Sequence, residues 1–90
     1  MVIKATKIRL KNDASGDDER DISEIYIVTD EDKAGWCSVS DIIEILDAGG
    51  VISVDKYPNT YLKVVNANPK YVRSEANNKR TDNLLNLPHL

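Results

Sequence analysis

Only one stretch of this chain has the periodicity of a helix, and residues that start and stop helices bound it on both sides. Within "WCSVSDIIEILDAGG" (36–50), apolar residues recur at the i, i+3, i+4 and i+7 spacing of one helix face: Val39, Ile42, Ile43 and Leu46. Ser38 is a good N-cap, and Gly49 and Gly50 supply a left-handed C-cap. The sequence therefore predicts one helix, from about residue 39 to residue 48.

The rest of the chain is typical of strands separated by turns. With no Phe, one Trp and four Tyr, its core has to consist mainly of Ile, Val and Leu, and β-branched side chains favour strands. Strands are predicted at 5–11, 22–29, 51–57, 60–66 and 70–76, with a short sixth strand at 79–81. Pro58 and Asn59 are predicted in the middle of a hairpin turn, and Asn77 and Asn78 in a second one.

These elements predict an α+β fold in the order β-β-α-β-β-β. We expect a mostly antiparallel sheet of five or six strands, with one helix covering its apolar face. The chain of 90 residues is expected to form one small domain over residues 1–90.

The net charge of -3 conceals a segregation of charge along the chain. Residues 1–11 carry four basic and no acidic side chains, residues 12–47 twelve acidic and two basic ones, and residues 48–90 six basic and three acidic ones. Lys7, Arg9 and Lys11 alternate with apolar residues and are predicted to form the outer face of the first strand. Overall acidity argues against nucleic acid as the main partner, although the two basic ends would form a local patch if they met.

Residues suited to catalysis or metal binding are few. Cys37 is the only thiol and His89 the only imidazole, and a Cys–His pair would require the end of the chain to be held at catalytic geometry. Cys37 precedes the predicted helix, where the helix dipole would lower its pKa; alternatively it packs as a small buried hydrophobe. Two carboxylate-rich loops, 13–21 and 30–32, lack the EF-hand spacing and are interpreted as solvated loops. We therefore expect no enzyme, no metal and no cofactor.

The later strands combine aromatic and basic residues. An antiparallel sheet with exposed Tyr and interleaved Lys or Arg commonly holds single-stranded nucleic acid, and a solvated strand face explains the same pattern. The candidate partner-binding residues are Tyr61, Lys63, Lys70, Tyr71, Arg73, Lys79 and Arg80. Trp36, at the helix entrance, is expected to anchor the helix to the core or its rim rather than to serve as a binding platform.

The end of the chain is rich in leucine. Leu84 and Leu87 lie one turn apart and Pro88 disfavours helix at Leu87, so a single turn is predicted. The leucines either cover an open part of the sheet or dock into the groove of a partner. Docking on the domain itself is favoured, because so small a domain needs these side chains for its core. The tail motif consists of Asp82, Asn83, Leu84, Leu85, Leu87 and Pro88.

The tail "TDNLLNLP" (81–88), preceded by "YVRSEANNKR" (71–80), resembles the C-terminal signature of a family of small bacterial and phage-associated proteins, the domain-of-unknown-function family 3892. The matching residues are Tyr71, Val72, Arg73, Asp82, Asn83, Leu84, Leu85, Leu87 and Pro88. The opening "IKATKIRL" and the helix ending in Gly-Gly are similar to the family as well, whereas Ser74 stands where the family usually has Thr. The resemblance implies no activity. It implies a cytosolic accessory protein of a bacterium or a mobile element.

The expected function is that of a cytoplasmic, non-enzymatic interaction module that binds a protein partner or a second copy of itself. The alternative is weak binding of single-stranded nucleic acid by the Tyr, Lys and Arg residues of the later strands. A single cysteine favours a reducing compartment, because it excludes an internal disulfide. The first residues do not resemble a signal peptide and no apolar run approaches the length of a membrane span, so no membrane contact is expected.

Overall fold

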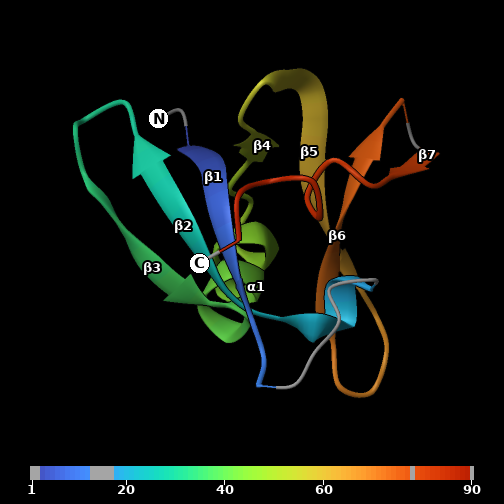
Figure 1. Cartoon of the computed structure of the whole chain (residues 1–90). Helices are drawn as coiled ribbons and strands as arrows, with labels where there is room; N and C mark the ends of the chain where they lie inside the picture. Colours follow the sequence, from blue (N-terminus) through green and yellow to red (C-terminus); the bar gives the residue numbers. More distant parts are fainter. Residues whose placement is uncertain (1–2, 13–17, 78, 90) are drawn as a thin grey trace.

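A computed structural model of the protein describes residues 3–12, 18–77 and 79–89, which form a mixed sheet and one α-helix (Figure 1). The strands are β1 (Ile3–Leu10), β2 (Ile22–Thr29), β3 (Ala34–Ser38), β4 (Ile52–Val54), β5 (Tyr57–Val65), β6 (Tyr71–Ala76) and β7 (Lys79–Thr81). The helices are the 3₁₀ turn η1 (Glu19–Asp21) and α1 (Val39–Asp47). The strand order is β3-β2-β1-β4-β5-β6-β7, and all neighbours are antiparallel except β1 and β4.

The predicted α+β class with one helix is confirmed, but the sheet differs from the prediction. It has seven strands instead of five or six, and it is mixed because β4 returns from α1 to lie parallel to β1. The additional strand is β3 (Ala34–Ser38), a stretch where no strand was predicted. Its short segment lacks a clear alternation, and it is held by pairing with β2, for example Tyr26 opposite Trp36. The element order is therefore β-β-β-α-β-β-β-β, apart from η1.

The hairpin between β4 and β5 turns three residues earlier than predicted. Val54 pairs with Tyr57, so the loop consists of Asp55 and Lys56, and Lys56 has a φ of 70°. Pro58 lies within β5, where the register of the β4–β5 ladder shifts between its paired residues Tyr57 and Tyr61. A proline fits there because it has no amide hydrogen to donate to a regular ladder. The second predicted turn does contain Asn77, with a φ of 54°, whereas residue 78 lies outside the described residues.

Helix α1 begins and ends close to the predicted residues. The hydroxyl of Ser38 accepts a hydrogen bond of 3.1 Å from the backbone N–H of Asp41, which confirms the N-cap. At the other end, Gly49 has a φ of 94° and its N–H donates to the carbonyl of Leu46, while the N–H of Gly50 donates to that of Ile45 at 2.9 Å. These two bonds are the Schellman motif, which satisfies carbonyls that the helix itself leaves free.

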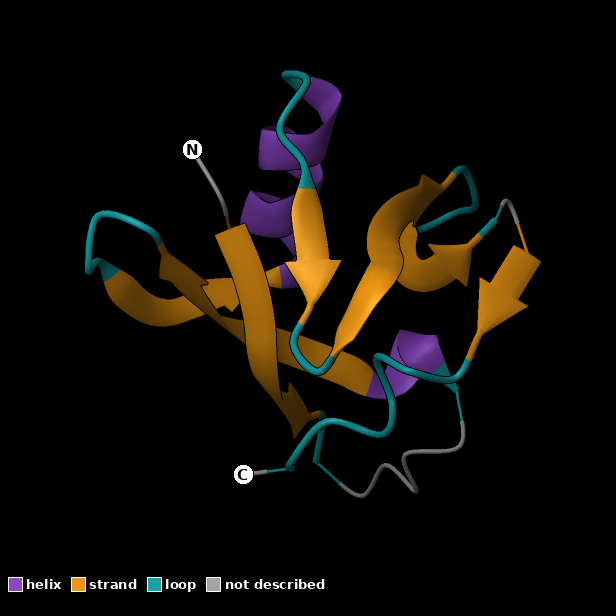
Figure 2. Ribbon diagram, turned by 90° about the horizontal axis from the view of Figure 1, so that it is seen from above, coloured by secondary structure: helices purple, strands orange, loops and turns teal. Residues whose placement is uncertain are grey.

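The sheet is curled, and α1 and the tail lie on opposite sides of the molecule. Three strands separate β6 from β2 in the sheet, yet η1, which leads into β2, packs against β6. In Figure 1, α1 lies behind β1 while the tail crosses in front, and Figure 2 shows the two on opposite sides. Apolar residues of the sheet, α1 and the tail form one core, whose buried members are Ala5, Ile8, Ile22, Ile25, Ile42, Ile52, Val54, Leu62, Val72, Leu84 and Leu87.

The C-terminal tail docks on its own domain. Leu84 is fully buried and Leu87 nearly so. The buried hydroxyl of Ser74 accepts the backbone N–H of Leu84 at 3.1 Å and the hydroxyl of Thr81 at 2.9 Å. The side-chain amide of Asn83 donates to the hydroxyl of Thr60 at 2.8 Å. The tail is therefore held by burial and by a satisfied polar network, as a buried polar group requires.

Candidate functional site

Three neighbouring strands place basic and aromatic side chains on the side of the sheet that faces away from the core. Lys7 pairs with Tyr26, and Tyr26 pairs with Trp36, so the three form a row across β1, β2 and β3. Directly opposed residues of a sheet point to the same side, and Lys4 and Arg9 belong to the flanking rows of that side. We call Lys4, Lys7, Arg9, Tyr26 and Trp36 the basic–aromatic face.

The cations of this face lie over its aromatic rings. The ammonium nitrogen of Lys7 is 5.0 Å from the centroid of the Tyr26 ring, and the guanidinium carbon of Arg9 is 4.2 Å from that of Trp36. The two rings meet edge to face, with centroids 5.2 Å apart and planes at 75°. Arg9 also forms an ion pair of 2.8 Å with Glu24. Such contacts fix the side chains in place and leave them half-exposed.

Apart from Glu24, which lies opposite Arg9 on this side, acidic residues gather on two other surfaces of the described molecule. Helix α1 packs against the core and exposes Asp41, Glu44 and Asp47, and it contains no basic residue. The exposed turn of the β2–β3 hairpin carries Asp30, Glu31 and Asp32. The charge segregation seen along the sequence therefore becomes a segregation in space, with the helix acidic and the outer side of β1 basic.

The expectation that Trp36 anchors the helix to the core or its rim is wrong, because Trp36 belongs neither to the core nor to the apolar residues packed against it. Trp36 lies in β3, before α1, and contacts Tyr26 and Arg9 on the outer side of the sheet. The neighbouring residue Cys37 points to the core instead, because successive residues of a strand face opposite sides. The helix pattern within residues 36–50 could not predict the position of Trp36, because that position depends on the pairing of β3 with β2.

The structure brings together only part of the candidate residues on the later strands. Tyr61, Lys63 and Arg73 share the outer side of β5 and β6, with Lys63 directly opposite Arg73. Arg73 is engaged in an ion pair of 2.8 Å with Glu75. Lys79 lies exposed in β7. By register, Tyr71, opposite Val65, and Arg80, opposite Glu75, belong to the same side as Arg73. Tyr71 contacts Arg20 and Arg80 binds Glu19, so five of the seven candidates share this side, whereas Lys70 and Lys79 do not.

Arg80 holds a buried carboxylate. Glu19 is 1% exposed, and its two oxygens accept hydrogen bonds of 3.0 and 2.6 Å from the Arg80 guanidinium. The hydrogen bond and the charge of Glu19 raise the pKa of Arg80. The interpretation of this loop as fully solvated is therefore wrong at Glu19, which pins η1 to β7. Residues 13–17 of the same loop lie outside the described residues.

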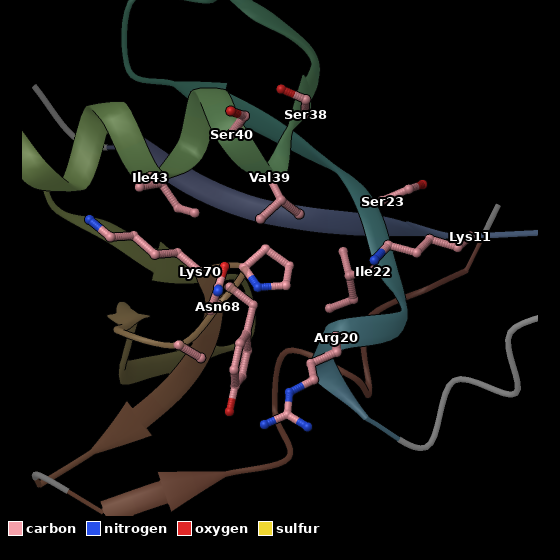
Figure 3. Close-up of a pocket in the computed structure, with 13 residues that line it drawn as sticks. Lys11, Arg20, Ile22, Ser23, Ser38, Val39, Ser40, Ile43, Asn68 and Lys70 are labelled. Carbon is pink, nitrogen blue, oxygen red and sulfur yellow. The ribbon is translucent and has the colours of Figure 1, made fainter.

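A groove of about 850 Å³ lies between the start of β2, the N-terminus of α1 and the loop before β6 (Figure 3). Lys70 and Tyr71 of the candidate residues line it, together with Lys11 and Arg20. The guanidinium carbon of Arg20 is 4.8 Å from the centroid of the Tyr71 ring. This groove shares no residue with the basic–aromatic face.

Cys37 does not have the environment of a reactive thiol. Burial raises its pKa above the ordinary value of 9.0, and the charge of Asp41 raises it further. Of the two alternatives for Cys37, packing as a small hydrophobe agrees with its place against the core, and a pKa lowered by the helix dipole does not agree with the raised pKa. His89 is exposed, and its Nε2 lies 2.8 Å from the carbonyl oxygen of Leu85.

Across residues 3–12, 18–77 and 79–89, no three His, Cys, Asp or Glu side chains are grouped so as to hold a metal ion. The described helices include none with the length and apolar character needed to cross a membrane.

Comparison with known proteins places the chain in a protein family. Residues 4–88 match the family described as "Protein of unknown function (DUF3892)". The chain belongs to this family. No curated protein and no solved structure matches the chain.

Membership of DUF3892 agrees with the resemblance seen in the sequence, and the matched range has a structural counterpart. It begins in β1 and ends at Pro88, whose carbonyl accepts a hydrogen bond from Ile8 of β1. The family match thus runs from the first strand to the residue that closes the tail onto that strand. The family description assigns no function, so function has to be argued from the surfaces of this domain.

Proposed function

We propose that this DUF3892 domain is a non-enzymatic binding module that holds single-stranded nucleic acid on its basic–aromatic face. The observation that carries the proposal is the cross-strand row of Lys7, Tyr26 and Trp36, flanked by Lys4 and Arg9. Bases stack on aromatic side chains irrespective of sequence, and Lys and Arg neutralise the phosphates between them.

The distribution of charge supports the proposal despite the net charge of -3. The exposed acids of α1 lie on the core side of the sheet, away from the basic–aromatic face. A polyanion that approaches the basic–aromatic face therefore meets basic side chains and not the acids of α1, which orients its approach. The acidic turn at residues 30–32 follows Thr29, which pairs with Ile3 at the start of β1. Because this turn repels phosphates, we expect the bound nucleic acid to end before it.

Trp36 provides the direct measurement, because it is the only tryptophan. Titration with a twelve-nucleotide oligothymidylate at low salt is expected to quench its fluorescence to saturation. With three basic residues in contact, the logarithm of the affinity should fall with the logarithm of salt concentration with a slope of about -2. Absence of saturable quenching at low salt would dismiss the proposal.

Matched variants locate the binding surface. Lys7→Gln is expected to weaken binding and to reduce the salt slope by about 0.7. Lys56→Gln, in the β4–β5 turn, removes the same charge away from this face and should leave the affinity unchanged. Lys63→Gln tests the later strands: a loss equal to that of Lys7→Gln would move the site to β5 and β6. Binding of Trp36→Leu, followed by anisotropy of a labelled oligonucleotide, should weaken about tenfold or more.

A second candidate function is association with a protein, in particular with a second copy. The observation that favours it is the exposed acidic side of α1, formed by Asp41, Glu44 and Asp47, opposite in charge to the basic–aromatic face. Contact between two such different surfaces is heterologous and would build open-ended assemblies. Native mass spectrometry at low and high salt tests it: assemblies should form at low salt and be lost in the Glu44→Lys variant, and a monomer under both conditions would reject it.

A further inference from the structure

We infer that the groove between β2, α1 and the loop before β6 binds a small amphipathic anion: a phosphate or carboxylate attached to a flat apolar body. This site goes beyond the proposed binding of nucleic acid on the basic–aromatic face and shares no residue with it. The inference rests on three features of the groove, namely its size, its apolar floor and the charge of its rim.

The size and the floor of the groove suit an apolar body. Its volume of about 850 Å³ falls in the range typical of small-molecule sites. Its apolar floor is formed by residues from three parts of the fold: Ile22 of β2, Val39 and Ile43 of α1, and Pro69 and Tyr71 at the start of β6. In Figure 3, the side chains of Ile22 and Val39 converge on the space between β2 and the loop that carries Asn68 and Lys70. A flat ring placed there would contact Val39, Ile43 and Pro69 and remove their remaining surface from water, whereas Ile22 is already buried in the core.

The rim of the groove is basic on several sides. Lys11, Arg20 and Lys70 approach it from three separate segments, and the thirteen lining residues include no Asp or Glu. Within the part of the chain that the structure describes, none of these three cations forms an ion pair. The carboxylate of Asp18 is engaged by the backbone N–H of Arg20 at 2.8 Å.

Hydroxyl groups complete the polar part of the rim. Ser23, Ser38 and Ser40 line the groove, and Ser38 and Ser40 stand at the start of α1. The first backbone N–H groups of a helix carry partial positive charge, which adds to the field of the three cations. A ligand with an anionic head and an apolar body would place the head beside the cations of the rim and the body against the apolar residues of the floor. An inorganic anion would use only the rim, and a neutral ring only the floor.

The test compares phenyl phosphate, inorganic phosphate and benzyl alcohol by NMR titration of the isotope-labelled full chain. Phenyl phosphate is expected to shift the amide signals of Ser40, Ile43 and Tyr71 to saturation, with a Kd at least tenfold lower than that of inorganic phosphate. Benzyl alcohol should give no saturation over the same range. Equal Kd values for the two phosphates would overturn the inference, since they would indicate attraction by charge alone.

Variants assign the binding to the groove. The double variant Arg20→Gln, Lys70→Gln should raise the Kd for phenyl phosphate at least tenfold. The control Lys56→Gln, titrated with phenyl phosphate in the same way, should leave the Kd unchanged. The variant Ser40→Asp separates loss of binding from loss of folding. An acidic residue in the first turn stabilises the helix, and its negative charge repels the anionic ligand. If Ser40→Asp binds phenyl phosphate as tightly as the unchanged protein, the site is not this groove and the inference fails.

Discussion

The backbone N–H of Ile8 donates a hydrogen bond of 2.9 Å to the carbonyl oxygen of Pro88, so the end of the chain pairs with its first strand. β1 pairs with β4 only through Ile3, Lys4 and Ala5, and the tail takes the place beside β1 at Ile8. An unpaired strand edge in this position would expose backbone polar groups, and the tail satisfies one of them. The leucine-rich tail is therefore part of the fold.

Truncation of a tail leucine should destabilise the whole domain. Leu84→Ala is expected to lower the free energy of unfolding by about 2–5 kcal/mol, because the side chain is fully buried and leaves a cavity. Urea unfolding measures the effect. Asn86→Ala, exposed in the same turn, is the matched control and should change stability by less than about 0.5 kcal/mol. Amide exchange at Leu84 and Leu87 as fast as in a free peptide would contradict the docked tail.

The three glycines with described surroundings should respond differently to alanine. A Cβ at Gly50 would come within 2.7 Å of the carbonyl oxygen of Ile45, so Gly50→Ala should cost about 1–3 kcal/mol of stability. Gly49 has open space but a φ of 94°, and Gly49→Ala should cost about 1–2 kcal/mol in backbone strain. Gly35→Ala meets nothing within 4 Å and is the control. Thermal melting measures the stability of the three variants. A loss of stability in Gly35→Ala equal to that in Gly50→Ala would contradict the close contact at Gly50.

The ion pair of Glu19 and Arg80 should contribute to stability more than an exposed pair does. Arg80→Met leaves the carboxylate of Glu19 buried without its partner, so the midpoint of urea unfolding should fall. Lys79→Met, one residue earlier in β7, removes an equal charge from an exposed position and should leave the midpoint almost unchanged. Equal midpoints for the two variants would show that the pair adds nothing.

The thiol of Cys37 should react slowly. Because burial and Asp41 raise its pKa in the folded protein above the ordinary 9.0, the fraction of thiolate at pH 8 is below that of a free cysteine. Alkylation by iodoacetamide at pH 8 should therefore be slower than for free cysteine, and Asp41→Asn should speed it slightly, since burial is the larger cause. A rate above that of free cysteine would disprove the raised pKa.

The same shift fixes the sign of a pH dependence of stability. The folded state favours the protonated thiol, so its contribution is complete below pH 9, the ordinary pKa of the unfolded chain. It is lost as the pH rises from there through the higher pKa of the folded protein. Cys37→Ser should remove this contribution to the loss of stability in alkaline solution, which urea unfolding at a series of pH values would detect.

The local elements with a strong signal of their own were predictable. The helix over residues 39–48, its Ser38 cap and its Gly-Gly end depend on contacts within one or two turns, and the structure has them as α1. Strand β2 over residues 22–29 has a dense apolar pattern and keeps the predicted bounds. The docking of the tail follows from composition, because a small domain has few other apolar side chains for its core.

The candidate surfaces depended on pairing and could not be predicted in the same way. Trp36 joins Tyr26 because β3 pairs with β2, and Lys7 joins both through the register of β1, which two irregularities shift. Lys11, Arg20 and Lys70 meet at the groove because the sheet curls and brings η1 beside β6. Each of these contacts joins segments that are distant in the sequence, and a local sequence pattern does not predict that such segments lie close together.

Local patterns in the sequence are enough to predict the α+β class, the helix α1 with its caps and the burial of the tail leucines. These depend on side-chain periodicity and on local hydrogen bonds, which act over a few residues. Long-range pairing in the folded protein produces the seventh strand, the parallel pairing of β1 and β4, the meeting of Tyr26 and Trp36 with the cations of β1, and the gathering of cations around the groove. Strand order and curvature arise from burying the whole set of apolar side chains at once, and so they are properties of the assembled sheet.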